Sequence, residues 1–216
     1  MSIRFDTGGE SYNISTSLPS NTIPSTVSMW VLLVVDTNTY QIFFNDDDTN
    51  YLLGCDGTGQ VLIFYNGSDR TTSQTLALGT WYHVALVASG TSRRIYLNGA
   101  LVLDYTDPGS SDVPASYYIG SSSGGSFTLN GRLGAFKMWT AALTQAEVQR
   151  EMRSQRPVRV SDLYAFWPML DVGNGGTDFS AFGRNLSASG TLTTEDNPPV
   201  PWELGLPGYF LQSMKQ

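Results

Sequence analysis

The sequence is poor in the residues that most often carry redox, metal and nucleophilic chemistry. It has one cysteine, Cys55, and one histidine, His83, among 216 residues. A single cysteine cannot form an internal disulfide, and no basic neighbour activates its thiol, so we expect Cys55 to be buried and inert. His83 shares a predicted strand face with Trp81, Ala85 and Val87, which favours a packed histidine over a catalytic base or a metal ligand.

Basic residues and long apolar runs are also scarce. Twelve Lys and Arg residues stand against 19 Asp and Glu, which gives a formal net charge of −7. Contact with nucleic acid phosphates needs a dense Lys/Arg face, so we expect no nucleic acid partner. No stretch approaches the ~20 apolar residues of a membrane span, so we expect no membrane partner. Met1–Asp6 lacks the basic start and apolar run of a secretory signal, and we expect none.

What the sequence does contain is a series of short alternating segments rich in β-branched and aromatic residues. Residues 94–97 and 101–103 flank Asn98-Gly99, a strong hairpin signal because both residues tolerate the positive φ of a type I′ turn. Thr26–Val35 is apolar on both faces, which predicts a strand in a sheet that is covered on both sides or meets a partner. The spacing of the turns is typical of a sandwich, so the chain is predicted to be all-β.

One helix interrupts this pattern. Thr144 and Glu147 have the spacing of a capping box, in which each side chain bonds the backbone N–H of the other residue. Leu143 and Val148 occupy the positions of a hydrophobic staple. We expect a short surface helix that ends near Ser154, before the next proline.

The last quarter of the chain adds strands at residues 163–167 and 185–189. We predict one domain at residues 1–196, in which residues 163–189 complete the sandwich. A proline-rich arm follows at residues 197–216.

The prolines of the arm remove ladder donors and stiffen the chain, so we expect the arm to extend away from the sheets. Its apolar side chains would expose a wider patch than a soluble monomer tolerates. We therefore predict an intermolecular contact in an oligomer, while docking across its own sandwich stays open as the alternative. The contact residues would be Trp202, Leu204, Leu206, Tyr209, Phe210 and Leu211.

Several motifs occur in a familiar order over residues 1 to about 155. They are Ser2–Asp6 with Tyr12 and Ile14, Gly79–Ala85 with Ile95–Gly99, Ile119-Gly120 with Phe127, Asn130–Gly134, and Ala142–Thr144 with Glu147. In this order they resemble the laminin-G-like domains of the concanavalin A-like lectin and glucanase superfamily. The resemblance implies a two-sheet antiparallel jelly-roll sandwich with one short helix.

The late segment departs from the usual order of that family. Tyr164–Trp167 and the turn Asp178–Asn185 resemble what often precedes the early strand, yet here they come last. The resemblance therefore leaves two arrangements. Either the domain is circularly permuted with adjacent termini, or the late segment pairs with a neighbouring chain.

Because the superfamily includes glucanases, we looked for their carboxylates. A retaining glycosidase needs two carboxyl groups ~5–5.5 Å apart, and in these glucanases they alternate along one strand. No pair among the five glutamates has that spacing on a predicted strand. Glu147 and Glu151 lie one helical turn apart, where a solvated helix face is the simpler interpretation. We expect the protein not to be an enzyme.

Calcium is the cofactor to consider, because relatives hold it with loop carboxylates and carbonyls. One candidate set is Asp46, Asp47 and Asp48 in a hairpin turn. The better candidate is Asp171 with Asp178 in a glycine-rich loop, although neither stretch has EF-hand spacing.

Aromatic residues near predicted loops are candidates for sugar binding, since flat rings cover the apolar faces of sugars while amides and carboxylates bind hydroxyls. The candidates are Tyr65 with Asn66 and Asp69, and Tyr117 with Tyr118. The alternative is that these tyrosines belong to the core or to a sheet edge.

Three functions fit these observations. The preferred one is a non-catalytic module of a virion, as a capsid decoration, cement or tail-associated protein that can also attach to glycans. It rests on the resemblance of residues from Phe166 to Pro201 to the ends of laminin-G-like proteins of tailed phages, and it implies other virion subunits as partners. The alternatives are a secreted carbohydrate-binding module, which would be extracellular, and a glucanase or lyase relative with a degenerate site.

Overall fold

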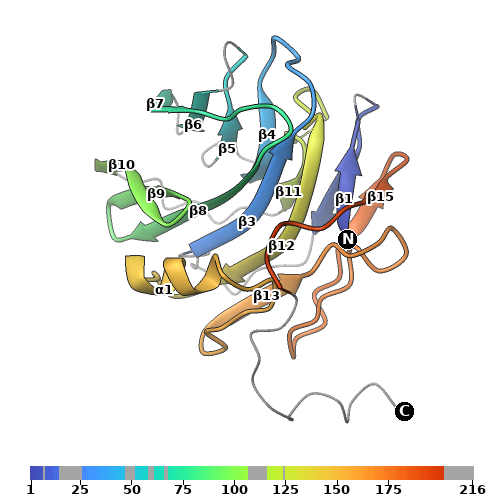
Figure 1. The fold of residues 1–216 in the computed structure, drawn as a ribbon. Coiled ribbons are helices and arrows are strands. Elements are labelled where there is room, and N and C mark those ends of the chain that lie inside the picture. The colour runs from blue at the N-terminus through green and yellow to red at the C-terminus, as the bar shows by residue number, and fades with distance from the viewer. Residues whose placement is uncertain are drawn as a thin grey trace.

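Two antiparallel sheets face each other across one hydrophobic core in the computed structural model of the chain (Figure 1). The structure describes residues 1–6, 8–14, 26–46, 52–57, 61–65, 68–106, 116–123 and 125–201, with the backbone alone at residues 46, 61 and 63–65. The expected fold class, a two-sheet antiparallel sandwich with one short helix, is confirmed.

Sheet A has eight strands and sheet B has seven. The order in sheet A is β10 (Ala100–Thr106), β9 (Ser92–Leu97), β8 (Trp81–Ser89), β3 (Thr26–Leu33), β12 (Gly131–Trp139), β1 (Ser2–Phe5) and β15 (Thr193–Glu195), with β13 (Leu163–Trp167) also paired to β12. The order in sheet B is β14 (Ser187–Ser189), β2 (Ser11–Ile14), β11 (Tyr117–Ile119), β4 (Gln41–Asp46), β5 (Leu52–Cys55), β6 (Val61–Tyr65) and β7 (Asp69–Thr75).

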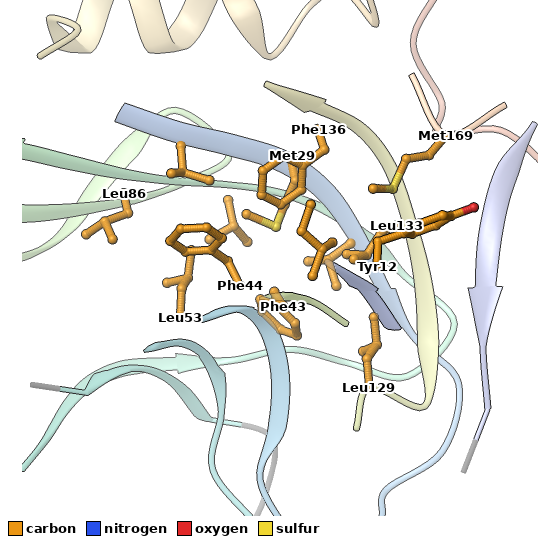
Figure 2. Close-up of a cluster of buried hydrophobic side chains, with 14 of the residues drawn as sticks. Tyr12, Met29, Phe43, Phe44, Leu53, Leu86, Leu129, Leu133, Phe136 and Met169 are labelled. Atoms are coloured by element: carbon orange, nitrogen blue, oxygen red, sulfur yellow. The ribbon is translucent and has the colours of Figure 1, made fainter. Parts of the chain in front are cut away.

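The core lies between the inner faces of the two sheets (Figure 2). Met29 and Phe136 reach it from sheet A, and Phe44 and Leu53 reach it from sheet B; all four are at most 2% exposed. Phe44 packs on Phe136 with ring centroids 5.9 Å apart, which joins the two sheets directly. Full burial of each such side chain contributes roughly 1.5–3 kcal/mol, so this layer is the main source of stability.

The outer face of sheet A is covered as well, as the two-sided apolar pattern of β3 predicts. The helix α1 (Gln145–Glu151) lies over it, and Val148 packs with Val87 and Trp139 in a second apolar cluster. The capping box of Thr144 and Glu147 is confirmed, because both reciprocal bonds are present.

The helix ends three residues earlier than the sequence predicts. Its last carbonyl, that of Glu151, accepts a hydrogen bond from Lys137 Nζ at 3.1 Å, and the same ammonium binds the carbonyl oxygens of Ser154 and Arg156. Because these carbonyls point at a side chain of the sheet, they cannot continue a helical ladder.

The long strand β12 changes its partner halfway along its length. Its first half pairs with β1 and its second half with β13, and Ala135 between them has φ +50°.

β14 pairs with β2 and β15 pairs with β1, so the late segment contributes strands to both sheets of its own chain. Of the two arrangements that the sequence left open, the structure shows pairing within the chain. The start of the chain lies beside the end of the predicted domain, where the hydroxyl of Ser2 donates to the carbonyl of Asp196 at 2.6 Å.

The first residues of the proposed arm do not extend away from the domain. Pro198 is buried against Gly134 of β12, where an added Cβ would collide with its ring. The amide N–H of Gln155 donates to the carbonyl of Pro201 at 3.1 Å, and its side chain donates to that of Val200 at 2.7 Å. Residues 197–201 thus pack across the outer face of sheet A, which corrects the expectation of an extended segment. Trp202, Leu204, Leu206, Tyr209, Phe210 and Leu211 lie outside the described residues.

Candidate functional site

The strand register of sheet B brings polar and aromatic residues into one row across its outer face. In this row each residue is the direct cross-strand partner of the next, and the alternate positions on the same strands point into the core. The row consists of Ser187, Asn13, Tyr118, Asn45, Leu52, Tyr65 and Asp69. Three of the five residues proposed for sugar binding therefore share one face, although the side chain of Tyr65 lies outside the described part.

Tyr118 occupies the middle of the row, with Asn13 on one side and Asn45 on the other. Tyr118 and Asn13 are half-buried, whereas Asn45 is fully buried. Among the described residues, neither the Oδ1 nor the Nδ2 atom of Asn45 has a hydrogen-bond partner. An unsatisfied buried amide costs about 1–3 kcal/mol, so Asn45 keeps unused hydrogen-bonding capacity beneath the row.

A second aromatic group adjoins the far end of the row. The hydroxyl of Tyr40 donates to Asp69 Oδ2 at 2.7 Å, and the Tyr40 ring packs edge-to-face on Phe127 with centroids 5.5 Å apart. Phe127 is 39% exposed and Asp69 is exposed, so this group presents a ring and a carboxylate to solvent.

The row lies at the end of sheet B from which several connections leave. β2 ends at Ile14, β4 ends at Asp46 and β6 ends at Tyr65, while β11 begins at Tyr117. The adjoining connections are rich in Ser, Thr, Asn, Asp, Gly and Pro, and they include the predicted residues Asn66, Asp47 and Asp48, which lie outside the described residues. Connections at one end of a rigid sandwich are the usual location of binding residues.

The prediction for Tyr117 is wrong. Its side chain is 2% exposed and stacks on Phe44 in the core, with centroids 5.4 Å apart. Adjacent residues of a strand point to opposite faces, so only one of the two tyrosines can face outward, and that one is Tyr118.

The proposed calcium ligands Asp171 and Asp178 serve other roles. Asp178 is buried, and its carboxylate accepts hydrogen bonds from the backbone N–H groups of Phe166, Ser180 and Arg184 and from the Ser180 hydroxyl, at 2.7–3.0 Å. Asp171 Oδ1 accepts the Asn174 N–H at 2.9 Å and closes a local turn. Within the described ranges, no three His, Cys, Asp or Glu side chains group as a metal site. The side chain of Asp46 lies outside those ranges.

The residues considered for catalysis are packed. His83 is 1% exposed and lies edge-to-face against Trp30 at 5.5 Å; burial, and then the charge of Lys137, lower its pKa to about 3. Burial raises the pKa of the Cys55 thiol. Glu151 is also buried rather than solvated, which corrects the interpretation from its helix position: its Oε2 lies 2.9 Å from Lys137 Nζ.

Comparison with known proteins identifies the family. Residues 6–149 match the laminin G model of the concanavalin A-like lectin/glucanases superfamily. The chain belongs to the concanavalin A-like lectin/glucanases superfamily. No curated protein is significantly similar to this superfamily member in sequence.

Solved structures share the fold of this superfamily member at low identity. A candidate carbohydrate binding protein from Bacteroides ovatus is 21% identical with a TM-score of 0.62; the match covers 94% of this chain but only 63% of that one. A heptameric SAP-like pentraxin from Limulus polyphemus is 17% identical with a TM-score of 0.60 over 88% and 92% of the two chains. Domain 4 of an extracellular arabinanase from Geobacillus stearothermophilus, in complex with arabinotriose, is 20% identical with a TM-score of 0.50 over 70% and 72%.

Several residues of the site were not found from the sequence. The sequence does not mark Asn13, Asn45, Tyr40 and Phe127 as members of one site, because each lies far along the chain from the residue that it joins. The position of Asn13 between Tyr12 and Ile14 was the available signal, since a polar residue that alternates with apolar ones marks an outward position on a strand. None of the helical residues described here forms a segment long and apolar enough to cross a bilayer. The virion role and the oligomeric arm stay predictions from the sequence.

Proposed function

We propose that this protein is a non-catalytic carbohydrate-binding module and that the outer face of sheet B binds the glycan. The observation that carries the proposal is the position of Tyr118 between Asn13 and Asn45 as direct cross-strand neighbours. An aromatic ring flanked by amides matches the two surfaces of a sugar, because the ring covers apolar C–H groups while the amides bind hydroxyls.

Two further features support this surface. Within the described part of the chain, the buried amide of Asn45 has no partner, and it would gain hydrogen bonds from a water that bridges to a sugar hydroxyl. Phe127 and Asp69 extend the pattern of ring and carboxylate beyond Tyr118, which fits an oligosaccharide better than a single sugar. Glycan binding is also consistent with the descriptions of two structures of the same fold.

The test is titration calorimetry of the protein and of Tyr118→Ala with a panel of oligosaccharides that includes arabino-oligosaccharides. Loss of the ring should weaken binding at least tenfold, which corresponds to about 1.4 kcal/mol, while the melting temperature stays near that of the parent. Leu101→Ala is the matched control, because Leu101 is 43% exposed on β10 of the other sheet.

Equal losses in Tyr118→Ala and Leu101→Ala, or no binding to any member of a broad panel, would contradict the proposal. Asn45→Ala provides a second test, since it removes the unpartnered amide. It should weaken binding without lowering stability as much as the loss of a satisfied buried amide does.

The absence of catalysis is part of the proposal. Incubation of the protein with laminarin, alginate and xylan should release no products. Measurable cleavage that is lost when one carboxylate is replaced would show that the module is an enzyme.

A place on a virus particle is a separate proposal, supported by the resemblance of residues from Phe166 to Pro201 to phage laminin-G-like proteins. Purified particles from the source would contain the protein at a fixed copy number. Its recovery only in the free fraction would count against a virion role.

A further inference from the structure

Arg184 lies between two aromatic rings, in the turn that precedes β14. Its Cζ atom is 3.9 Å from the ring centroid of Tyr164 and 4.4 Å from that of Phe182. Tyr164 is buried in β13, whereas Phe182 is 60% exposed, so the guanidinium is held at the surface between an inner and an outer ring. Stacking on both faces leaves only the edges of the guanidinium for hydrogen bonds.

The backbone on both sides of Arg184 is fixed by buried groups. Its N–H donates to Asp178 Oδ2 at 2.8 Å, and its carbonyl accepts the indole N–H of Trp167 at 2.8 Å. Asp178 also binds Ser180 and Phe166, so one carboxylate holds the whole turn from residue 178 to residue 184. The guanidinium is therefore preorganised before any ligand arrives.

The hydrogen-bonding capacity of this guanidinium is largely unused. Of its five N–H donors, one on Nη1 binds the Tyr164 carbonyl at 2.6 Å. Its Nε and Nη2 groups bond to no residue in the described part of the chain, and no described carboxylate lies within 4.0 Å. Arg159 shows the contrast, since it pairs with both Glu147 and Asp162. Among the described residues, the positive charge of Arg184 is thus without an ion-pair partner, in a chain whose net charge is −7.

The same turn carries a second exposed ring. Phe179 is 42% exposed and packs edge-to-face on Phe166 with centroids 6.4 Å apart. Phe179 and Phe182 therefore add two exposed apolar surfaces to the same short segment as the unpaired guanidinium edge.

We propose that Arg184, Phe179 and Phe182 form a second binding site, for a sugar acid. A planar guanidinium edge accepts a carboxylate through two parallel hydrogen bonds, and an exposed phenyl ring covers the apolar face of the sugar that carries it. The site extends the proposed glycan binding to acidic polysaccharides, but it rests on different residues from the row around Tyr118.

The experiment compares oligogalacturonate with its carboxyl-reduced form, which has the same sugar backbone without the charge. By calorimetry, the unmodified protein should bind the acidic form at least tenfold more tightly. Arg184→Gln should abolish this preference, and Arg184→Lys should restore only part of it, because lysine keeps the charge and loses the planar fork. Arg94→Gln removes one positive charge from an exposed pair with Asp104 and should leave the preference unchanged.

Phe182→Ala is a second variant for the case in which Arg184→Gln fails to fold, because Phe182 is exposed and its loss should not disturb the core. This variant should bind the acidic form severalfold more weakly. Equal affinity for the two oligosaccharides, or an equal loss in Arg94→Gln, would overturn the proposal. Tighter binding of a sulfated oligosaccharide than of oligogalacturonate would overturn the assignment to carboxylates. Tyr118→Ala should leave the acid preference intact, so failure of this site and failure of the sheet B site are distinguishable.

Discussion

Lys137 and Glu151 form an ion pair in which both side chains are 1% exposed, with Nζ and Oε2 2.9 Å apart. Lys137 projects from the outer face of sheet A and Glu151 ends α1, so the pair joins the helix to the sheet. Desolvation lowers the pKa of Lys137, and the charge of Glu151 opposes this shift. The carboxylate also accepts the N–H groups of Val158 and Arg159, so it organises the chain that follows the helix.

Replacing one member of this pair should be strongly destabilising. Lys137→Met leaves a buried carboxylate without its counter-charge, so we expect the free energy of unfolding to fall by about 3–5 kcal/mol. Adding Glu151→Gln to Lys137→Met should recover part of this loss, because the amide oxygen still accepts N–H groups and carries no charge. Urea unfolding of both single variants and the double variant measures the coupling, and strictly additive losses would contradict it.

Because His83 is buried, we expect the free energy of unfolding to fall in mild acid. Its pKa is lowered to about 3 in the folded protein from an ordinary value of 6.5, so the unfolded chain binds its proton first as the pH falls. The stability that depends on neutral His83 is fully present above pH 6.5. Between pH 6.5 and pH 3, the free energy of unfolding falls by about 1.4 kcal/mol per pH unit because of this residue. Glu147, whose pKa is lowered from 4.5 chiefly by the Thr144 N–H, adds its own loss only below that value.

The measurement is the free energy of unfolding between pH 7 and pH 4.5, for the parent and for His83→Leu. The slope of the parent should flatten in the variant. Parallel slopes would show that other groups cause the acid sensitivity.

Removal of the late strands should prevent cooperative folding. Truncation after Arg159 deletes β13, which pairs with β12, and β15, which pairs with β1. It also removes Trp167, which is fully buried with its ring centroid 5.8 Å from that of Phe136. We expect an insoluble or molten product, visible as a loss of near-ultraviolet circular dichroism. A truncated protein with an unchanged cooperative melt would contradict this.

The arm is best tested with two truncations. A chain that ends at Pro201 keeps Pro198 on Gly134, whereas a chain that ends at Glu195 loses this contact. If the arm joins subunits, the chain ending at Pro201 should sediment as a smaller species with an unchanged melting temperature. The chain ending at Glu195 should also melt at a lower temperature. Identical sedimentation of all three chains, with lower melting temperatures for both truncations, would show that the arm is intramolecular.

The fold class was predictable because alternation and turn residues are local properties of the sequence. Asn98 and Gly99 adopt φ values of +49° and +76° in the expected hairpin turn. The capping box specified the start of α1 for the same reason. β7 was missed because DRTTSQT is polar and half-exposed and shows no alternation of apolar residues.

The site was only partly predictable because it depends on register. Sequence placed Tyr117 and Tyr118 near a loop, but only the pairing of β11 with β2 and β4 decides which tyrosine faces the core. The buried role of Glu151 depends on Lys137, 14 residues earlier on another element. Such partners are fixed by tertiary packing, which leaves no local pattern in the sequence.

The pairing of β1 with β15 also sets how the domain would respond to force. Ser2 and Glu195 are partners at the same end of this antiparallel pair, and β15 is the last strand beyond β1 in the order of sheet A (Figure 1). Tension applied between these two points would open the pair like a zipper, breaking its hydrogen bonds one after another rather than shearing them together.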